Sequence, residues 1–275
     1  MHPYIHHDSQ QYFAFNIWSI ESAKAVMDGA AALNSDVILQ TSMKAYELLD
    51  KKELRAFVSS YADKIGIHAY LHLDHCKRLD FIKEAIHYGW DSVMIDASDL
   101  PLNENIRLTR IVCDNAKSRN VLVEAEVGQI AGQEDALSVT TEGIAKIEDV
   151  ELFLENTSID MLAVAVGTAH GLYKGTPLLH YDLIDKVVHL SDIPLVIHGG
   201  TGLTEETFSH LLSYRNIKKI NISTDVKLSY RQGIEESIDN GYLLREGFDP
   251  LKIHKKIHDA IMDMTVTKLK ILREE

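Results

Sequence analysis

The sequence predicts a single parallel (β/α)8 barrel, because short apolar runs rich in β-branched residues alternate with longer amphipathic stretches. Their continuous apolar character is typical of strands covered on both faces. The length of 275 residues fits one barrel of about 250 residues, although it would also fit two ordinary domains. The eight runs are residues 13–17, 36–42, 68–73, 92–97, 121–128, 161–167, 194–200 and 218–224.

The stretches between the runs predict helices. Residues 19–34 open with a serine ahead of an amphipathic run and close at Asn34. Residues 79–90 keep apolar side chains three and four positions apart, and Gly89 is a stop signal for this helix. Residues 249–271 predict one more amphipathic helix, with 241–250 as the loop that brings it back against the barrel. The alternative fold is a doubly wound open sheet, but the GxGxxG signal expected after its first strand is missing.

Composition excludes several classes of function. The formal charge of −13 disfavours nucleic acid and anionic membranes as partners. No apolar run reaches the roughly 18 residues of a membrane span, and residues 1–11 form a polar start that we expect to be a flexible tail. Cys76 and Cys113 show no disulfide framework, which indicates a reducing, cytoplasmic location.

Polar side chains stand at the carboxyl ends of the predicted strands, where the strands of a parallel barrel converge on one rim. Burying so many polar groups together is costly unless they bind one another, a metal or a substrate. These residues are Asn16, Gln40, Ser42, Asp74, His75, Asp96, Glu124, Glu126, His170, His198 and Asn221.

Three histidines in this set predict a metal centre. His75, His170 and His198 follow the third, sixth and seventh runs, and three imidazoles with one open position are a catalytic zinc arrangement. Imidazole ligands would also suit cobalt, iron or nickel. His68 and His72 lie inside a run, and we interpret both as structural.

Two glycine-rich segments, 167–171 and 198–202, flank these histidines. Glycines allow backbone N–H groups to approach an anion, and a following helix N-terminus adds partial positive charge. Barrels often bind phosphate after strands seven and eight, where residues 198–202 and Thr224 lie. A tight turn explains either segment alone, whereas both together beside a metal ligand favour phosphate.

Carboxylates complete the predicted site. Asp74 precedes His75, so we expect it within a few ångströms of the metal. Glu134 and Asp135 lie in residues 129–144, an irregular segment that we interpret as a mobile loop over the rim. On composition alone, a solvated acidic loop is the simpler explanation of that segment.

Several motifs, in this order, carry a resemblance to a known family: LHLDHC, SVMIDAS, PLNENI, VEAEVG, VAVGTAHGLYKG, VIHGGTG and KINISTD. From Phe13 to about Leu269 the chain resembles the class II fructose- and tagatose-bisphosphate aldolases. The resemblance implies one domain spanning 1–275, one catalytic zinc ion per chain, and a homodimer or homotetramer. It also implies an additional monovalent cation near the substrate phosphate in many members.

The motif match assigns roles residue by residue. It implies that His75, His170 and His198 hold zinc and that Glu126 is an acidic alternative ligand. Asp74 matches the general acid, and Glu134 matches the base on the mobile loop. The positions around the phosphate and the dihydroxyacetone unit are Gly171, Gly199, Thr201, Asn221 and Thr224.

Departures from the family pattern leave the substrate open. Trp18, Cys76, Asp99 and Ser223 differ from the usual residues, and no basic residue for a second phosphate is evident. The expected substrate is tagatose or fructose 1,6-bisphosphate, and the alternative is another ketose 1-phosphate. A non-catalytic barrel subunit is a further alternative. An amidohydrolase is disfavoured because its HxH would end the first strand, where this chain has Asn16.

Overall fold

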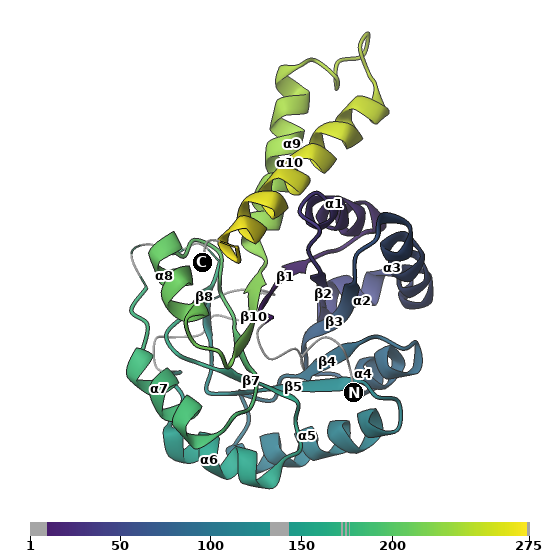
Figure 1. Ribbon diagram of the computed structural model, residues 1–275. Coiled ribbons are helices and arrows are strands. Elements are labelled where there is room, and N and C mark those ends of the chain that lie inside the picture. The colour runs from purple at the N-terminus through teal and green to yellow at the C-terminus, as the bar shows by residue number, and fades with distance from the viewer. Residues whose placement is uncertain (1–9, 133–142, 172, 174, 176, 274–275) are drawn as a thin grey trace.

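The computed structural model describes residues 10–132, 143–171, 173, 175 and 177–273. Eight parallel strands close into a barrel in the order β1-β10-β9-β7-β5-β4-β3-β2, with helices around the outside (Figure 1). The predicted fold class is therefore confirmed. The barrel strands are β1 (Tyr12–Asn16), β2 (Val37–Ser42), β3 (Ala69–Cys76), β4 (Ser92–Ile95), β5 (Leu122–Val127), β7 (Met161–Val164), β9 (Leu195–Ile197) and β10 (Ile217–Ile222).

Two short strands that the sequence pattern did not predict pair with each other apart from the barrel. They are β6 (Ala131–Gly132) and β8 (Ala169–His170), which run parallel. A pair of two-residue strands has no detectable alternation, so hydrophobic periodicity cannot reveal it. This small sheet places His170 above the barrel rim.

Helices follow the barrel strands, and local side chains cap several of them. The Ser19 hydroxyl accepts from the backbone N–H of Ser22 at the start of the first helix, and Asp50 caps the third in the same way. The third helix ends at Gly66, whose φ of 76° is the left-handed conformation that glycine tolerates. The helices are α1 (Ile20–Ala31), α2 (Met43–Leu48), α3 (Lys51–Ile65), α4 (Leu79–His87), α5 (Leu102–Lys117), α6 (Ile147–Asn156), α7 (Tyr181–Leu190), α8 (Glu205–Leu212), α9 (Thr224–Asp239) and α10 (Pro250–Ile271).

The interior of the barrel changes from apolar to polar along its axis. A buried cluster fills the end where the strands begin, with Tyr12, Ile38, Tyr70, Leu122 and Met161 among its members. Because side chains two residues apart face the same side of a strand, the next inward positions belong to the same strands. Those positions are Asn16, Gln40, His72, Asp74, Glu124, Glu126, His198, Lys219 and Asn221, and the lower apolar layer supports them.

The last two helices form a hairpin arm that extends away from the barrel (Figure 1). The helix predicted at 249–271 is present as α10, but the loop before it turns the chain back along α9, so α10 packs on α9 and α1. Gly233 permits this close packing, since a Cβ there would lie 2.4 Å from the Cα of Ile257. None of the described helices combines the length and apolar character needed to cross a bilayer.

Candidate active site

An irregularity in β3 directs His75 towards the rim. The pairing of β3 with β4 shifts register between Leu73 and Cys76, and His75 has a φ of 46°. A bulge re-aims a side chain, and a non-glycine residue in the left-handed region is strained. The sequence pattern placed His75 just after the strand, whereas the structure includes it in β3. The bulge takes this side chain out of the simple alternation along the strand.

The structure brings the three predicted histidines together. One ring nitrogen each of His75, His170 and His198 falls in a group whose atoms all lie within 4.8 Å of one another. Nδ1 of His198 is 2.6 Å from Nε2 of His75, and the ring centroids of His75 and His170 are 4.8 Å apart. Three imidazole nitrogens that converge on one point are a suitable ligand set for zinc.

A second group of potential ligands shares His75. Nδ1 of His75 lies 2.9 Å from Oδ2 of Asp96 and 3.9 Å from Oε2 of Glu126. Burial raises the pKa of Glu126 to about 8, and the neighbouring Asp96 carboxylate adds to that shift. Burial lowers the pKa of His75, but Asp74 and Asp96 raise it by more, so this pKa lies well above its ordinary value. A cluster with several carboxylates favours the binding of a cation.

A third group, formed by His72, Asp74 and Glu124, lies deeper in the barrel. The Lys219 ammonium is 2.8 Å from Oε2 of Glu124, with both side chains fully buried. Positive charge is therefore already supplied there by the protein. Burial, followed by the charge of Lys219, lowers the pKa of His72 well below its ordinary value, which favours the neutral form. Nδ1 of His72 lies 2.7 Å from the Ser92 hydroxyl.

Asp74 is held by amide groups. The Gln40 amide donates to Oδ2 of Asp74 at 3.1 Å, and the Asn221 amide donates to Oδ1 at 3.2 Å. The Gln40 amide also donates to the side-chain oxygen of Asn16 at 2.7 Å. Asp74 is fully buried, so this network fixes a carboxylate of defined orientation next to His75.

Both glycine segments lie at the rim beside the histidines. A Cβ on Gly199 would lie 2.4 Å from the Ala169 carbonyl oxygen, so the two segments are in close contact. The Thr201 hydroxyl accepts from the Asp225 backbone N–H in the first turn of α9. Thr224, expected to end a strand, instead begins α9. The buried Ser223 hydroxyl at the start of that helix has no hydrogen-bond partner among the described residues.

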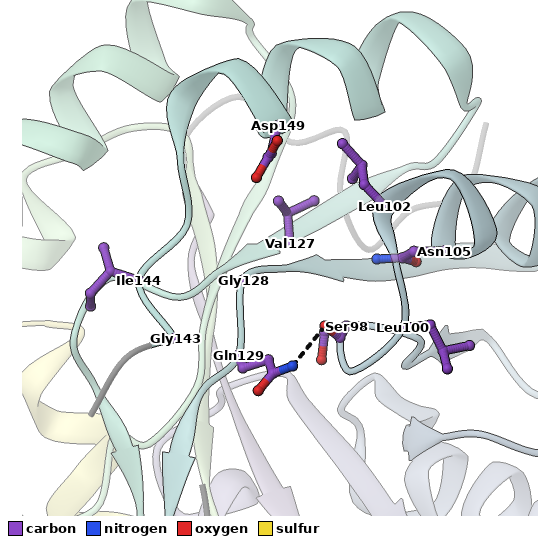
Figure 2. A pocket seen from close by; sticks show the side chains of 10 residues that line it. All are labelled: Ser98, Leu100, Leu102, Asn105, Val127, Gly128, Gln129, Gly143, Ile144 and Asp149. Carbon is purple, nitrogen blue, oxygen red and sulfur yellow. Dashed lines mark hydrogen bonds between the residues drawn. The ribbon is translucent and has the colours of Figure 1, made fainter. Parts of the chain in front are cut away.

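A cavity of about 380 Å³ is lined by Ser98 and Leu100 after β4, by residues at and after the end of β5, and by residues in α5 and near the start of α6 (Figure 2). The Gln129 amide donates to the Ser98 carbonyl oxygen across it, and the Ser98 hydroxyl donates to Asp96 at 2.8 Å. Gly143 and Gln129 line the cavity. Glu134 and Asp135, predicted on a mobile loop, lie outside the described residues, as do residues 1–9.

Tyr173 and Lys219 are functional candidates that the sequence pattern did not reveal. Tyr173 lies between two glycines and reads as a loop residue, and Lys219 reads as the solvated start of a strand. One signal was available for Lys219: it stands two residues before Asn221, on the same face of β10. A lysine at an inward barrel position needs a buried carboxylate partner.

Comparisons with known proteins find relatives that share the family and the fold. The family model described as fructose-bisphosphate aldolase class-II matches residues 4–275. The crystal structure of the YdjI aldolase from Escherichia coli K12 matches with a TM-score of 0.81 and 25% identity, over 96% of this chain and 92% of that one. A Coccidioides immitis protein provisionally assigned as a fructose-1,6-biphosphate aldolase matches with a TM-score of 0.85, also at 25% identity and over 96% and 92%.

A third structure, fructose-bisphosphate aldolase from Campylobacter jejuni, supports the fold. It matches with a TM-score of 0.75 and 22% identity, over 97% of this chain and 91% of that one. The family match covers the three histidines, Asp74 and both glycine segments in a single unbroken span. This chain belongs to the class II fructose-bisphosphate aldolase family.

Proposed function

We propose that this aldolase is zinc-dependent and cleaves tagatose or fructose 1,6-bisphosphate to dihydroxyacetone phosphate and glyceraldehyde 3-phosphate. The observation that carries the proposal is the convergence of His75, His170 and His198. The donor set suits zinc, since imidazole nitrogens are favoured ligands and no thiolate belongs to the group. Glu126 fits an alternative ligand, because its buried Oε2 has no hydrogen-bond partner among the described residues.

The proposed chemistry divides two proton transfers between Asp74 and Glu134. When bound at the histidines, zinc would supply Lewis-acid polarisation of the substrate carbonyl. The Asp74 carboxyl group, oriented by Gln40 and Asn221, exchanges the proton of the hydroxyl on the carbon that becomes the aldehyde. The bond between this carbon and the three-carbon half then breaks, and its electron pair stays on the three-carbon half. Glu134 delivers a proton to the carbon of the three-carbon half that keeps this pair. In the reverse direction, Glu134 removes the same proton.

The glycine segments support a phosphate site near Gly171, Gly199, Thr201 and Thr224. The N-terminus of the sixteen-residue α9 lies there, and helix N-termini favour anions. The unpartnered Ser223 hydroxyl is a hydrogen-bond donor that a phosphate oxygen would satisfy. Asn221, whose amide already reaches Asp74, is placed for the dihydroxyacetone unit. We include a monovalent cation beside the phosphate as part of this proposal.

We further propose a cytoplasmic homo-oligomer, a dimer or tetramer. Large apolar side chains are exposed along the arm and its tip: Ile238, Leu243, Leu244, Phe248 and Leu251. Exposed apolar side chains that gather on one projecting element mark an interaction surface. Both cysteines are free thiols, which fits a reducing compartment.

A different ketose 1-phosphate is the second candidate substrate, and one contact favours it. Lys77 follows the His75 ligand by two positions, and its ammonium lies 2.9 Å from the Asp99 carboxylate. Because the Asp99 carboxylate neutralises the Lys77 ammonium, Lys77 does not offer a free positive charge to bind a second phosphate. Trp18, Cys76 and Ser223 are the other residues that differ from the usual family pattern.

A substrate panel tests the proposal. The zinc-loaded enzyme would be assayed with tagatose 1,6-bisphosphate, fructose 1,6-bisphosphate, fructose 1-phosphate and unphosphorylated fructose, and compared by kcat/KM. We expect a bisphosphate to lead and unphosphorylated fructose to be a poor substrate. Equal cleavage of phosphorylated and unphosphorylated ketoses would refute the phosphate site. A lead for fructose 1-phosphate would assign the second candidate.

A further inference from the structure

Lys219 is a fully buried lysine in the middle of the barrel. Its ammonium lies 2.8 Å from Oε2 of Glu124, whose side chain is also fully buried. Isolating such charges from water is unfavourable, and apolar residues of similar size would often stabilise a fold at least as well. A buried ion pair at this position therefore calls for an explanation other than stability.

The second oxygen of Glu124 reaches a proposed metal ligand. Oε1 of Glu124 lies 2.9 Å from Nε2 of His198. A carboxylate can only accept, so Nε2 of His198 carries the hydrogen in this contact. Nδ1 is then the nitrogen that presents a lone pair, and it lies 2.6 Å from Nε2 of His75 at the rim. The carboxylate thus determines both the tautomer and the direction of the imidazole.

Lys219 fixes the carboxylate in turn. With the ammonium on one oxygen and His198 on the other, the carboxylate cannot turn out of the plane that joins these two partners without breaking a buried ion pair. Another polar neighbour of Oε2 is Nε2 of His72, at 3.5 Å, and this nitrogen makes no hydrogen bond among the described residues. Lys219 therefore bears on the orientation of His198 through Glu124.

We infer that Glu124 and Lys219 are positioning residues that hold His198 in the tautomer and direction required for metal binding. This inference rests on the proposed metal role of the three histidines. Partners of this kind, which bind the far nitrogen of a ligand histidine, typically affect metal affinity by about 10–100-fold.

Two double variants separate this role from a merely structural one. Glu124→Gln/Lys219→Met removes both charges but keeps an amide oxygen that accepts from His198. The NH2 group of the introduced amide can donate to Nε2 of His72. Glu124→Leu/Lys219→Met removes both charges and the acceptor. Neither variant leaves an unpaired buried ion, so both should fold, as circular dichroism and thermal unfolding would show. Lys219→Met alone leaves a buried carboxylate uncompensated and is avoided for that reason.

The measurements are the Co²⁺ dissociation constant, by competition with a chelator, and the visible absorption spectrum of the Co²⁺-loaded protein. We expect the Gln/Met variant, which keeps the acceptor for His198 but lacks the ammonium that holds it, to bind Co²⁺ more weakly than wild type. The Leu/Met variant, which also lacks the acceptor, should bind Co²⁺ more weakly still, by about 10–100-fold relative to wild type, with an altered spectrum. Wild-type affinity in the Gln/Met variant would remove Lys219 from the positioning role. Wild-type affinity and spectrum in a folded Leu/Met variant would overturn the inference. Equal losses in the two double variants would overturn it as well.

A reference variant separates failure of this inference from failure of the proposed function. His170→Ala removes a proposed ligand without touching Glu124 or Lys219. If wild type and His170→Ala bind Co²⁺ equally, the metal site itself is wrong. If only His170→Ala loses affinity while the Leu/Met variant keeps it, the metal site stands and the positioning role of Glu124 and Lys219 fails.

Discussion

The Tyr173 hydroxyl donates a hydrogen bond to the Gly199 carbonyl oxygen at 2.7 Å, joining the two loops that carry His170 and His198. The same hydroxyl accepts from the backbone N–H of Ala169 at 3.1 Å. Ala169 precedes His170, and Gly199 follows His198. One side chain therefore fixes the separation of two backbone segments that each bear a proposed ligand.

Replacing Tyr173 with Phe should weaken metal binding. The ring is kept, so packing is preserved, while both hydrogen bonds are lost at a cost of about 1 kcal/mol each. We expect a modest fall in the unfolding midpoint and a loss of Zn²⁺ affinity of about tenfold, as for other groups that orient ligands. Tyr214→Phe is the matched control, because it loses one hydroxyl contact to Asp185 on the outer surface. Unchanged Zn²⁺ affinity in Tyr173→Phe would contradict this account.

Two glycines allow a test of the contact between the loops. Gly199 and Gly171 both have positive φ values, 72° and 95°, so an alanine at either position is strained. At Gly199 the new Cβ would collide with backbone, 2.4 Å from the Ala169 carbonyl oxygen, whereas at Gly171 no atom of the described residues lies within 4 Å of a new Cβ. We expect Gly199→Ala to lower both stability and metal affinity. Gly171→Ala should lower stability by about 1 kcal/mol and keep the affinity. Titration calorimetry with Zn²⁺ distinguishes the two, and equal affinities would count against the contact.

Much of the barrel could be predicted from the sequence because each strand is buried on both faces and so forms an apolar run. It could also be predicted that His75, His170 and His198 lie close together, because the carboxyl ends of parallel barrel strands lie at one rim. The bulge at His75 could not, because register depends on pairing with β4. The partnership of Lys219 with Glu124 was likewise hidden, since 95 residues separate them in the chain.

The arm shows a different limit. The amphipathic pattern of 249–271 correctly indicated a helix, but helical periodicity reports only that one face is buried. It does not report which element covers that face. Here α9 and α1 cover it, and close approach depends on Gly233 and Gly29, whose role becomes visible only when the helices are placed together.

Asp74 and Glu134 should be separable by their effects on the two proton transfers. Asp74→Ala should suppress carbon–carbon cleavage by about 10²–10⁴-fold while some exchange of the carbon-bound proton of dihydroxyacetone phosphate with solvent remains. Glu134→Gln should suppress that exchange. Proton exchange is followed by NMR in D2O, and cleavage by a coupled assay. Normal exchange in Glu134→Gln would remove the base role from this residue.

Removal of metal should abolish activity reversibly. The purified protein should contain about one transition metal ion per chain, in keeping with a three-histidine catalytic site. Chelation should stop cleavage, and zinc or cobalt should restore it. Metal content is measured by elemental analysis, with His170→Ala as the variant that should not recover. Full activity in metal-free protein would rule out the proposed role of the three histidines.

Docking of the arm should depend on pH through Asp28. This carboxylate on α1 lies 2.8 Å from Nε2 of His258 on α10, and it accepts from the Tyr61 hydroxyl at 2.6 Å. Burial raises the pKa of Asp28, but hydrogen bonds from Lys24, Tyr61 and His258 lower it by more, so its pKa lies below the ordinary value.

A depressed carboxylate pKa means that the ionised form stabilises the folded state. The contribution of Asp28 to the free energy of unfolding is fully present above its pKa in the unfolded state, about 3.9. This contribution is lost as the pH falls through the pKa of Asp28 in the folded state. Asp28→Asn should therefore lower the free energy of unfolding by roughly 2 kcal/mol at pH 7 and by much less at pH 3. Urea unfolding at both pH values measures this difference, and Asp63→Asn on the exposed face of α3 is the control. An equal loss at pH 3 and pH 7 would mean that the charge of Asp28 does not hold the arm, since an effect of side-chain shape alone has no reason to follow the titration of a carboxylate.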